Sequence, residues 1–67
     1  MHLTINGEAH RFKSRQSSLP ALLEELGFAE IPVLVELNGE AVLRKEMDQV
    51  KLSEGDRLEI VQMVAGG

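Results

Sequence analysis

The chain has 67 residues, of which 43% are hydrophobic, a formal net charge of −4 and no cysteine. So short a chain forms one domain at most and buries only about 60% of its unfolded surface, so we expect neither a deep substrate pocket nor a stand-alone enzyme. The lack of cysteine excludes a disulfide framework, a cysteine–zinc site and a cysteine nucleophile.

The distribution of charged and apolar residues argues against two further classes of protein. Acidic and basic residues are mixed along the chain and aromatic residues make up only 3% of it, so we expect no nucleic-acid binding. The first residues lack the pattern of a signal peptide, and no apolar run approaches the roughly 18 residues that span a bilayer. These features predict a cytoplasmic protein that does not associate with membranes.

The N-terminal residues predict a β-hairpin. Leu3 and Ile5 alternate with polar neighbours, which is typical of a half-buried strand. Asn6-Gly7 follows, and this dipeptide is a strong hairpin signal because both residues tolerate the positive φ of a type I′ turn. We expect the return strand over residues 8–13, with Phe12 as its core anchor.

A helix is predicted after a polar connection over residues 14–18. Four leucines at i, i+3, i+4 and i+7 share one helical face: Leu19, Leu22, Leu23 and Leu26. Ser17 or Ser18 can cap the first turn, where Pro20 is tolerated. Gly27 is placed to end the helix. A helix of about nine residues is marginal alone, so it must pack across a sheet.

A second hairpin is predicted in the middle of the chain. Residues 33–37 alternate between inward and outward positions, which indicates a strand. Asn38-Gly39 repeats the hairpin signal of the first turn. We expect the return strand to be short and to lie near residues 41–43.

The remaining residues predict one more strand. Residues 44–51 have no clear period, so we expect a loop or a short helical turn with Met47 and Val50 directed inward. The last strand is expected over residues 57–64, with Leu58 and Ile60 inward because strand side chains alternate.

The order hairpin, helix, hairpin, strand predicts an α+β fold, in which one main helix crosses one face of a four- or five-stranded mixed sheet. We expect the folded domain to span residues 1–63 and residues 64–67 to form a flexible tail, made of Val64, Ala65, Gly66 and Gly67. The last two residues have no side chains, which suits a tail that threads a narrow cleft.

Three apolar residues are candidates for binding a partner. Val61 and Met63 should point away from the helix if Leu58 and Ile60 point toward it. Together with Leu34 they would form an apolar patch. The alternative interpretation is that these side chains pack at the edge of the sheet under the loops.

The other polar candidates indicate structure rather than chemistry. His2 and His10 have neither a cysteine nor a close histidine cluster beside them, so we interpret them as surface residues rather than metal ligands. Glu24-Glu25 is interpreted as a solvated helix face rather than a catalytic pair. We therefore expect no catalytic residue and no bound metal.

Several stretches spread over the whole chain carry a family resemblance. They are residues 5–7, 22–26, 35–40, 42–44, 55–56 and 57–67. With this order of predicted elements and a terminal Gly66-Gly67, the chain resembles proteins of the ubiquitin-like β-grasp fold. More narrowly, it resembles the ThiS family, the sulfur carriers of thiamine thiazole synthesis.

This resemblance implies that the carboxylate of Gly67 is the reacting group. An E1-like adenylyltransferase of the ThiF type would activate it with ATP, and a persulfide donor would then convert it into a thiocarboxylate. The sulfur would pass to a thiazole synthase of the ThiG type. The chain itself would bind no cofactor. The lack of cysteine agrees with this scheme, because no side chain can then hold transferable sulfur.

Two alternative functions remain open at this stage. The small subunit of molybdopterin synthase resembles the chain in fold and diglycine end, but that family commonly has paired prolines where this chain has Gln62-Met63. A β-grasp module could also act without covalent sulfur chemistry, either as a binding domain or as a modifier whose Gly67 is conjugated to lysines.

Overall fold

The computed structural model describes residues 1–63. It contains five strands and two helices: β1 (His2–Ile5), β2 (Glu8–Arg11), α1 (Leu19–Glu25), β3 (Val33–Leu37), β4 (Glu40–Val42), the 3-10 helix η1 (Arg44–Gln49) and β5 (Arg57–Gln62). The predicted tail over residues 64–67 lies outside the described residues. The predicted α+β fold, with one main helix and a mixed sheet, is confirmed.

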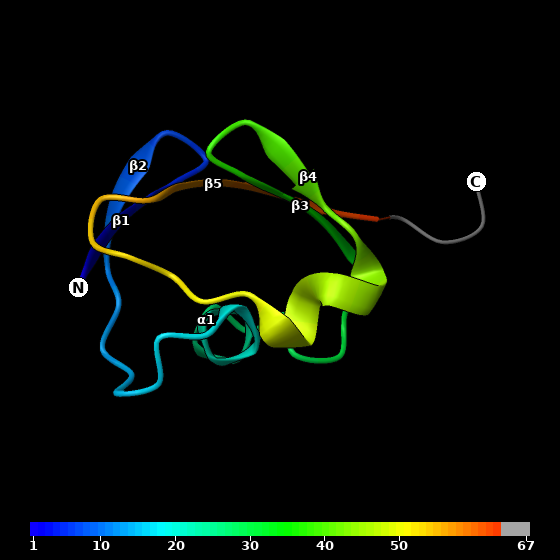
Figure 1. Ribbon diagram of the computed structural model, residues 1–67, viewed down its shortest axis with the longest axis horizontal. Helices are drawn as coiled ribbons and strands as arrows, with labels where there is room; N and C mark the ends of the chain where they lie inside the picture. Colours follow the sequence, from blue (N-terminus) through cyan, green and yellow to red (C-terminus); the bar gives the residue numbers. More distant parts are fainter. Residues whose placement is uncertain (64–67) are drawn as a thin grey trace.

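The strands form one sheet in the order β2-β1-β5-β3-β4. The pair of β1 and β5 is parallel, whereas the other three pairs are antiparallel. Figure 1 shows α1 and η1 on the same side of the sheet, so the opposite face is left open. The strand that comes last in the chain, β5, therefore occupies the centre of the sheet and joins the two hairpins.

Helix α1 begins and ends with the caps that its sequence predicts. The hydroxyl of Ser18 accepts a hydrogen bond of 3.2 Å from the N–H of Ala21. Gly27 has a φ of +88° after the last turn, which only glycine adopts without strain. The N–H of Phe28 then donates to the carbonyl of Leu23 at 2.7 Å, as in a Schellman cap. The helix spans 7 residues, slightly fewer than expected.

The core fills the space between α1 and the covered face of the sheet. Its buried residues are Leu3, Phe12, Leu19, Leu22, Leu23, Val33, Val35, Leu52, Leu58 and Ile60. The predicted inward directions of Phe12, Leu58 and Ile60 are confirmed. Leu26, Met47 and Val50 are half-buried against this core. Leu52 is an additional core residue, held where its N–H donates to the carbonyl of Ser17 at 2.7 Å.

The predicted ends of the two return strands were wrong by one or two residues. The assigned strand β2 stops at Arg11, although the N–H of Phe12 still donates to the carbonyl of Met1 at 2.8 Å while its side chain enters the core. The second hairpin stops at Val42, because Leu43 is the N-cap residue of η1 and its N–H donates to the carboxylate of Glu46 at 3.3 Å. Residues 44–49 form a short helix, as one of the two predicted possibilities stated.

The last strand, β5, ends at Gln62 rather than at residue 64. The N–H of Met63 still donates to the carbonyl of Pro32 at 2.9 Å. Proline has no N–H to return the second bond of this pair, so the ladder between β3 and β5 stops there.

Neither α1 nor η1, with 7 and 6 residues, is long enough to cross a bilayer, and the described residues contain no other helix.

Candidate functional site

The predicted reacting residue, Gly67, and the neighbouring residues 64–66 lie outside the described residues, so the site is described from where the chain leaves the sheet. Strand β5 lies between β1 and β3 and ends at Gln62. Met63 follows and is held to Pro32 by one backbone hydrogen bond. The last four residues therefore follow directly from the central strand of a packed sheet.

The open face of the sheet carries an apolar patch beside this exit. Four large apolar side chains are about half exposed, with exposed fractions of 48% to 59%: Leu34, Leu43, Val61 and Met63. We call these four residues the exit patch. Leu34 lies directly opposite Val61 in the register of β3 and β5. Val35 pairs with Val42, so Leu43 lies opposite Leu34 when this register is continued by one residue.

Three of the four residues in the exit patch were predicted from the sequence. The exposure of Leu34, Val61 and Met63 argues against the alternative that they pack under loops. Leu43 was missed, although the sequence contains the signal. A two-residue turn at Asn38-Gly39 pairs residue 37 with residue 40, and counting outward from that pair places Leu43 opposite Leu34.

Two carboxylates lie next to the exit patch on the same open face. Glu36 and Glu59 are directly opposite each other in the register of β3 and β5, and both are exposed. Like charges in this position destabilise a sheet. The exit patch is therefore an apolar surface bordered by two carboxylates, and Arg57 lines the same hollow of the sheet as Glu36 and Glu59.

Side chains of the two hairpin turns form hydrogen bonds with β5 on both of its edges. Asn6 and Asn38 have positive φ values of 52° and 51°, as the predicted turns require. The side-chain oxygen of Asn6 accepts from the N–H of Ile60 at 2.8 Å, and its amide nitrogen donates to the carbonyl of Ile60 at 3.0 Å. The side-chain oxygen of Asn38 accepts from the N–H of Arg57 at 2.9 Å. These contacts fix β5 along its length.

Both histidines contact carboxylates. His10 Nε2 lies 2.9 Å from Glu25 Oε2, and the N–H of Lys13 donates to Glu25 Oε1 at 3.1 Å. The hydrogen bond with His10, followed by that with Lys13, lowers the pKa of Glu25. Glu25 is thus a structural link between β2 and α1, whereas the sequence indicated only a solvated face.

The second histidine–carboxylate contact lies at the start of β1. The N–H of His2 donates to both carboxylate oxygens of Glu54 at 3.0 Å, and this lowers the pKa of Glu54. The His2 side chain is exposed, with its Nδ1 3.3 Å from Glu54. Among residues 1–63, no three His, Cys, Asp or Glu side chains are grouped so that they could hold a metal.

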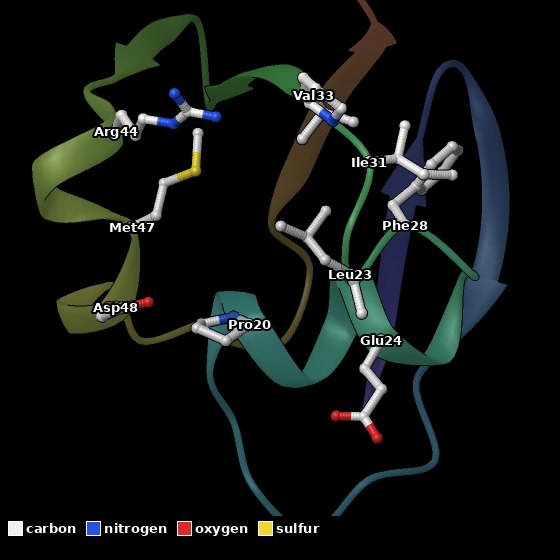
Figure 2. Close-up of a pocket in the computed structure, with 11 residues that line it drawn as sticks. Pro20, Leu23, Glu24, Phe28, Ile31, Val33, Arg44, Met47 and Asp48 are labelled. Atoms are coloured by element: carbon white, nitrogen blue, oxygen red, sulfur yellow. The ribbon is translucent and has the colours of Figure 1, made fainter.

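A cleft on the helix side of the sheet offers no converging set of reactive groups. Figure 2 shows it between α1, η1 and the segment that carries Phe28 and Ile31. Its polar lining consists of Glu24, Arg44 and Asp48, and the Glu24 carboxylate points away from Arg44.

Known proteins are similar to this chain over its whole length. It is 45% identical over 67 residues to a thiazole synthase of Paramagnetospirillum magneticum and 39% identical over 67 residues to a thiazole synthase of Magnetococcus marinus. The alignments cover 100% of this chain but only 20% of each of these two relatives. The chain therefore corresponds to a small part of those longer proteins.

Solved structures and a family model cover the chain more evenly. A crystal structure of a thiamine biosynthesis protein (ThiS) from Geobacter metallireducens matches with a TM-score of 0.81 and 33% identity over 100% of both chains. A solution structure of a thiamine biosynthesis protein from the same organism matches with a TM-score of 0.79 and 35% identity, over 100% of this chain and 88% of the other. The fold is thus the β-grasp fold that the sequence predicted. Because the ThiS family model matches residues 3–67, the chain belongs to the ThiS family.

Proposed function

We propose that this chain is a sulfur carrier for the synthesis of the thiazole ring of thiamine, with Gly67 as the residue that carries the sulfur. The observation that supports this most directly is the match of residues 3–67, including both terminal glycines, to the ThiS family. The two relatives named thiazole synthase and the solved thiamine biosynthesis protein favour thiazole over other sulfur acceptors.

The proposed chemistry takes place at the α-carboxylate of Gly67, which must be free when it is activated. A carboxylate oxygen attacks the α-phosphate of ATP, so that pyrophosphate leaves and an acyl-adenylate forms. A persulfide sulfur then attacks the acyl carbon and AMP leaves. Reductive cleavage of the resulting acyl disulfide by a thiol releases a thiocarboxylate, which donates its sulfur to a thiazole synthase.

The chain acts in this scheme as a protein co-substrate and not as an enzyme. An E1-like adenylyltransferase would bind ATP and supply the catalytic groups, and the chain would bind no cofactor of its own. Glycines at positions 66 and 67 allow close approach to the reaction centre, because they present no side chain to the walls of a channel.

The exit patch is proposed as the surface that these partners recognise. It lies beside the end of β5, so an enzyme that binds Val61 and Met63 receives the following residues next to that contact. Apolar area at the centre and charge at the border is the usual composition of a protein–protein interface. The carboxylates of Glu36 and Glu59 at that border favour a partner with basic groups facing them.

The role of the diglycine is tested by deleting Gly66 and Gly67, and by Gly66→Val, in the presence of the activating enzyme, ATP and a sulfur donor. Intact mass of the parent should show one oxygen replaced by sulfur, whereas both variants should lose this change. Each residue deleted moves the carboxylate back by about 3.3–3.6 Å, and a misplacement of about 1 Å can already cost on the order of 100-fold in rate.

Unfolding in urea provides the structural control for this experiment. Neither variant removes a described core residue, so the free energy of unfolding should change by less than about 0.5 kcal/mol. Normal thiocarboxylation of the truncated chain would overturn the carrier proposal and leave a non-covalent binding module as the better interpretation.

The role of the exit patch is tested by Met63→Asp, which places a charge in the apolar surface next to the tail. The variant should bind the activating enzyme more weakly while its unfolding transition stays unchanged, because Met63 is half exposed. Ala29→Asp is the matched control, since it adds the same charge at an exposed position on the cleft side. Equal affinities of the two variants in calorimetry would remove the exit patch from the proposal.

A further inference from the structure

The side chain of Asn6 forms hydrogen bonds with the backbone of β5 at a position where β1 no longer runs beside that strand. Strand β1 pairs with β5 only as far as Ile5 and Leu58, and the N–H of Asn6 donates to the carbonyl of Leu58 at 2.9 Å. The turn then carries the chain away. The Asn6 amide takes over both hydrogen bonds of Ile60, at 2.8 and 3.0 Å, where a continuing parallel strand would have made them.

Within the part of the chain that the structure describes, the next position on this edge of β5 has no strand beside it. Backbone groups along a strand point to alternate sides, so Gln62 faces the same way as Leu58 and Ile60. The ladder to β3 does not use the N–H of Gln62, because that ladder continues through the N–H of Met63 and the carbonyl of Pro32. Within residues 1–63, β1 ends its pairing at Leu58 and the Asn6 amide reaches no further than Ile60.

We propose that an extended segment of the activating enzyme pairs with β5 at Gln62 and continues the path of β1 along this edge. Such strand addition uses the main-chain N–H and C=O groups of an open edge for binding. The inference rests on the proposed function, which requires an enzyme that holds the residues after β5. The inference adds how the enzyme binds the end of β5, namely through backbone hydrogen bonds beside the exit patch.

The small size of the open edge favours an enzyme over a second copy of this chain. One free position offers about two backbone hydrogen bonds and buries little surface. A stable protein–protein interface usually buries about 1,200 Å² or more, so two copies joined only at this position would not stay together. An enzyme that also covers Val61 and Met63, the neighbours of Gln62, gains the missing apolar area. The Asn6 amide sets where the added strand begins.

Hydrogen exchange of the parent chain tests this pairing without any substitution. In the free chain the amide of Ile60, bonded to Asn6, should exchange slowly, and the amide of Gln62 should exchange rapidly. Saturation with the activating enzyme in the absence of ATP should slow exchange at Gln62 by at least about tenfold. Rapid exchange at Gln62 in the saturated complex would overturn the proposal.

Two substitutions at the same residue provide an independent test. Gln62→Pro removes the N–H that faces the open edge and leaves the ladder to β3 intact, whereas Gln62→Ala removes the side chain and keeps the N–H. The proline variant should bind the activating enzyme about tenfold more weakly, and the alanine variant should bind like the parent. Urea unfolding of both variants shows whether the fold is kept.

The possible results separate this inference from the proposed function. Equal affinities for two folded variants overturn strand pairing, even if the parent is thiocarboxylated normally. Failure of the parent to gain sulfur from an active enzyme overturns the proposed function instead. If proline unfolds the chain, the exchange measurement on the parent decides the matter.

Discussion

A single carboxylate joins three segments of the chain. Glu25, at the end of α1, contacts His10 of β2 at 2.9 Å and accepts the N–H of Lys13 from the connection that follows β2. These hydrogen bonds favour the charged carboxylate, which is why its pKa is lowered. The charged form of Glu25 therefore stabilises the docking of the first hairpin on the helix.

The lowered pKa of Glu25 predicts how stability depends on pH. Because the folded-state pKa lies below 4.5, this contribution is complete above about pH 4.5 and is lost as the pH falls through the folded-state pKa. The difference in unfolding free energy between the parent and Glu25→Gln should thus be largest near neutral pH and shrink in acid. Urea midpoints measured at several pH values check this.

Glu24→Gln serves as the control for that series, because it removes the same charge from the same helix. Its midpoint should follow the parent more closely than Glu25→Gln does. A difference between the parent and Glu25→Gln that stays constant down to about pH 2 would show that the carboxylate contacts contribute nothing through ionisation.

Residue roles that depend on local conformation were predictable, whereas long-range contacts were not. Asn6 and Asn38 were found as turn residues, because the positive φ of a type I′ turn restricts the local sequence. Their second role, as side-chain partners of β5, was missed. Ile60 is 54 positions away from Asn6, and no pattern in the sequence specifies which backbone group an amide will meet.

At the level of the element, β5 is held by side chains of the two hairpin turns as well as by its own buried side chains. Asn6 bonds Ile60 on one edge, and Asn38 bonds Arg57 on the other. Leu58 and Ile60 add the apolar contacts, with exposed fractions of 2% and 4%. Loosening either turn should therefore weaken the strand that leads to the exit patch.

Substitution of Asn6 tests this coupling. Asn6→Gly keeps the positive φ but removes the amide, so the backbone of Ile60 loses both partners and the chain should lose roughly 1–3 kcal/mol of stability. Asn6→Asp is the graded control, because a carboxylate can still accept from the N–H of Ile60. Hydrogen exchange at Ile60 should be fastest in Asn6→Gly. Unchanged exchange there would show that the Asn6 amide does not hold the strand.

The types of the elements were predictable from periodicity, but their ends were set by tertiary contacts. The pairing of β3 with β5 stops where Pro32 lacks an N–H, a limit that became visible only when Met63 was known to lie opposite it. Residues 44–51 have no helical stripe, and η1 forms there because Glu46 bonds the N–H of Leu43. A pattern of apolar residues does not indicate such local hydrogen bonds.

At the level of the whole molecule, the apolar pattern and the order of the elements predicted one helix packed on one face of a mixed sheet. A single leucine-rich helix between two hairpins can bury its stripe only on one face of a shared sheet. The last strand lies beside the first, as the parallel pair of β1 and β5 shows, and the order of the strands in the sheet was not predicted. The role of Gly67 stays a prediction, because it depends on partners that the sequence does not contain.

The central position of β5 predicts that the rest of the chain cannot fold without it. Within residues 1–63, the two hairpins are joined in the sheet only through this strand. A chain of residues 1–56 would lack the buried side chains of Leu58 and Ile60 and should show no cooperative unfolding transition. A chain of residues 1–63 should melt like the parent. Circular dichroism during heating distinguishes the two, and a cooperative melt of residues 1–56 would contradict the prediction.

This topology has a consequence for how the protein is made in the cell. A ribosome releases the two hairpins and α1 before residues 57–62, so the growing chain cannot complete its sheet until translation has passed β5. A polypeptide interrupted before β5 lacks the strand that joins the two hairpins, so it should stay unfolded and open to proteases. Folding of this chain should therefore depend on translation through its last strand.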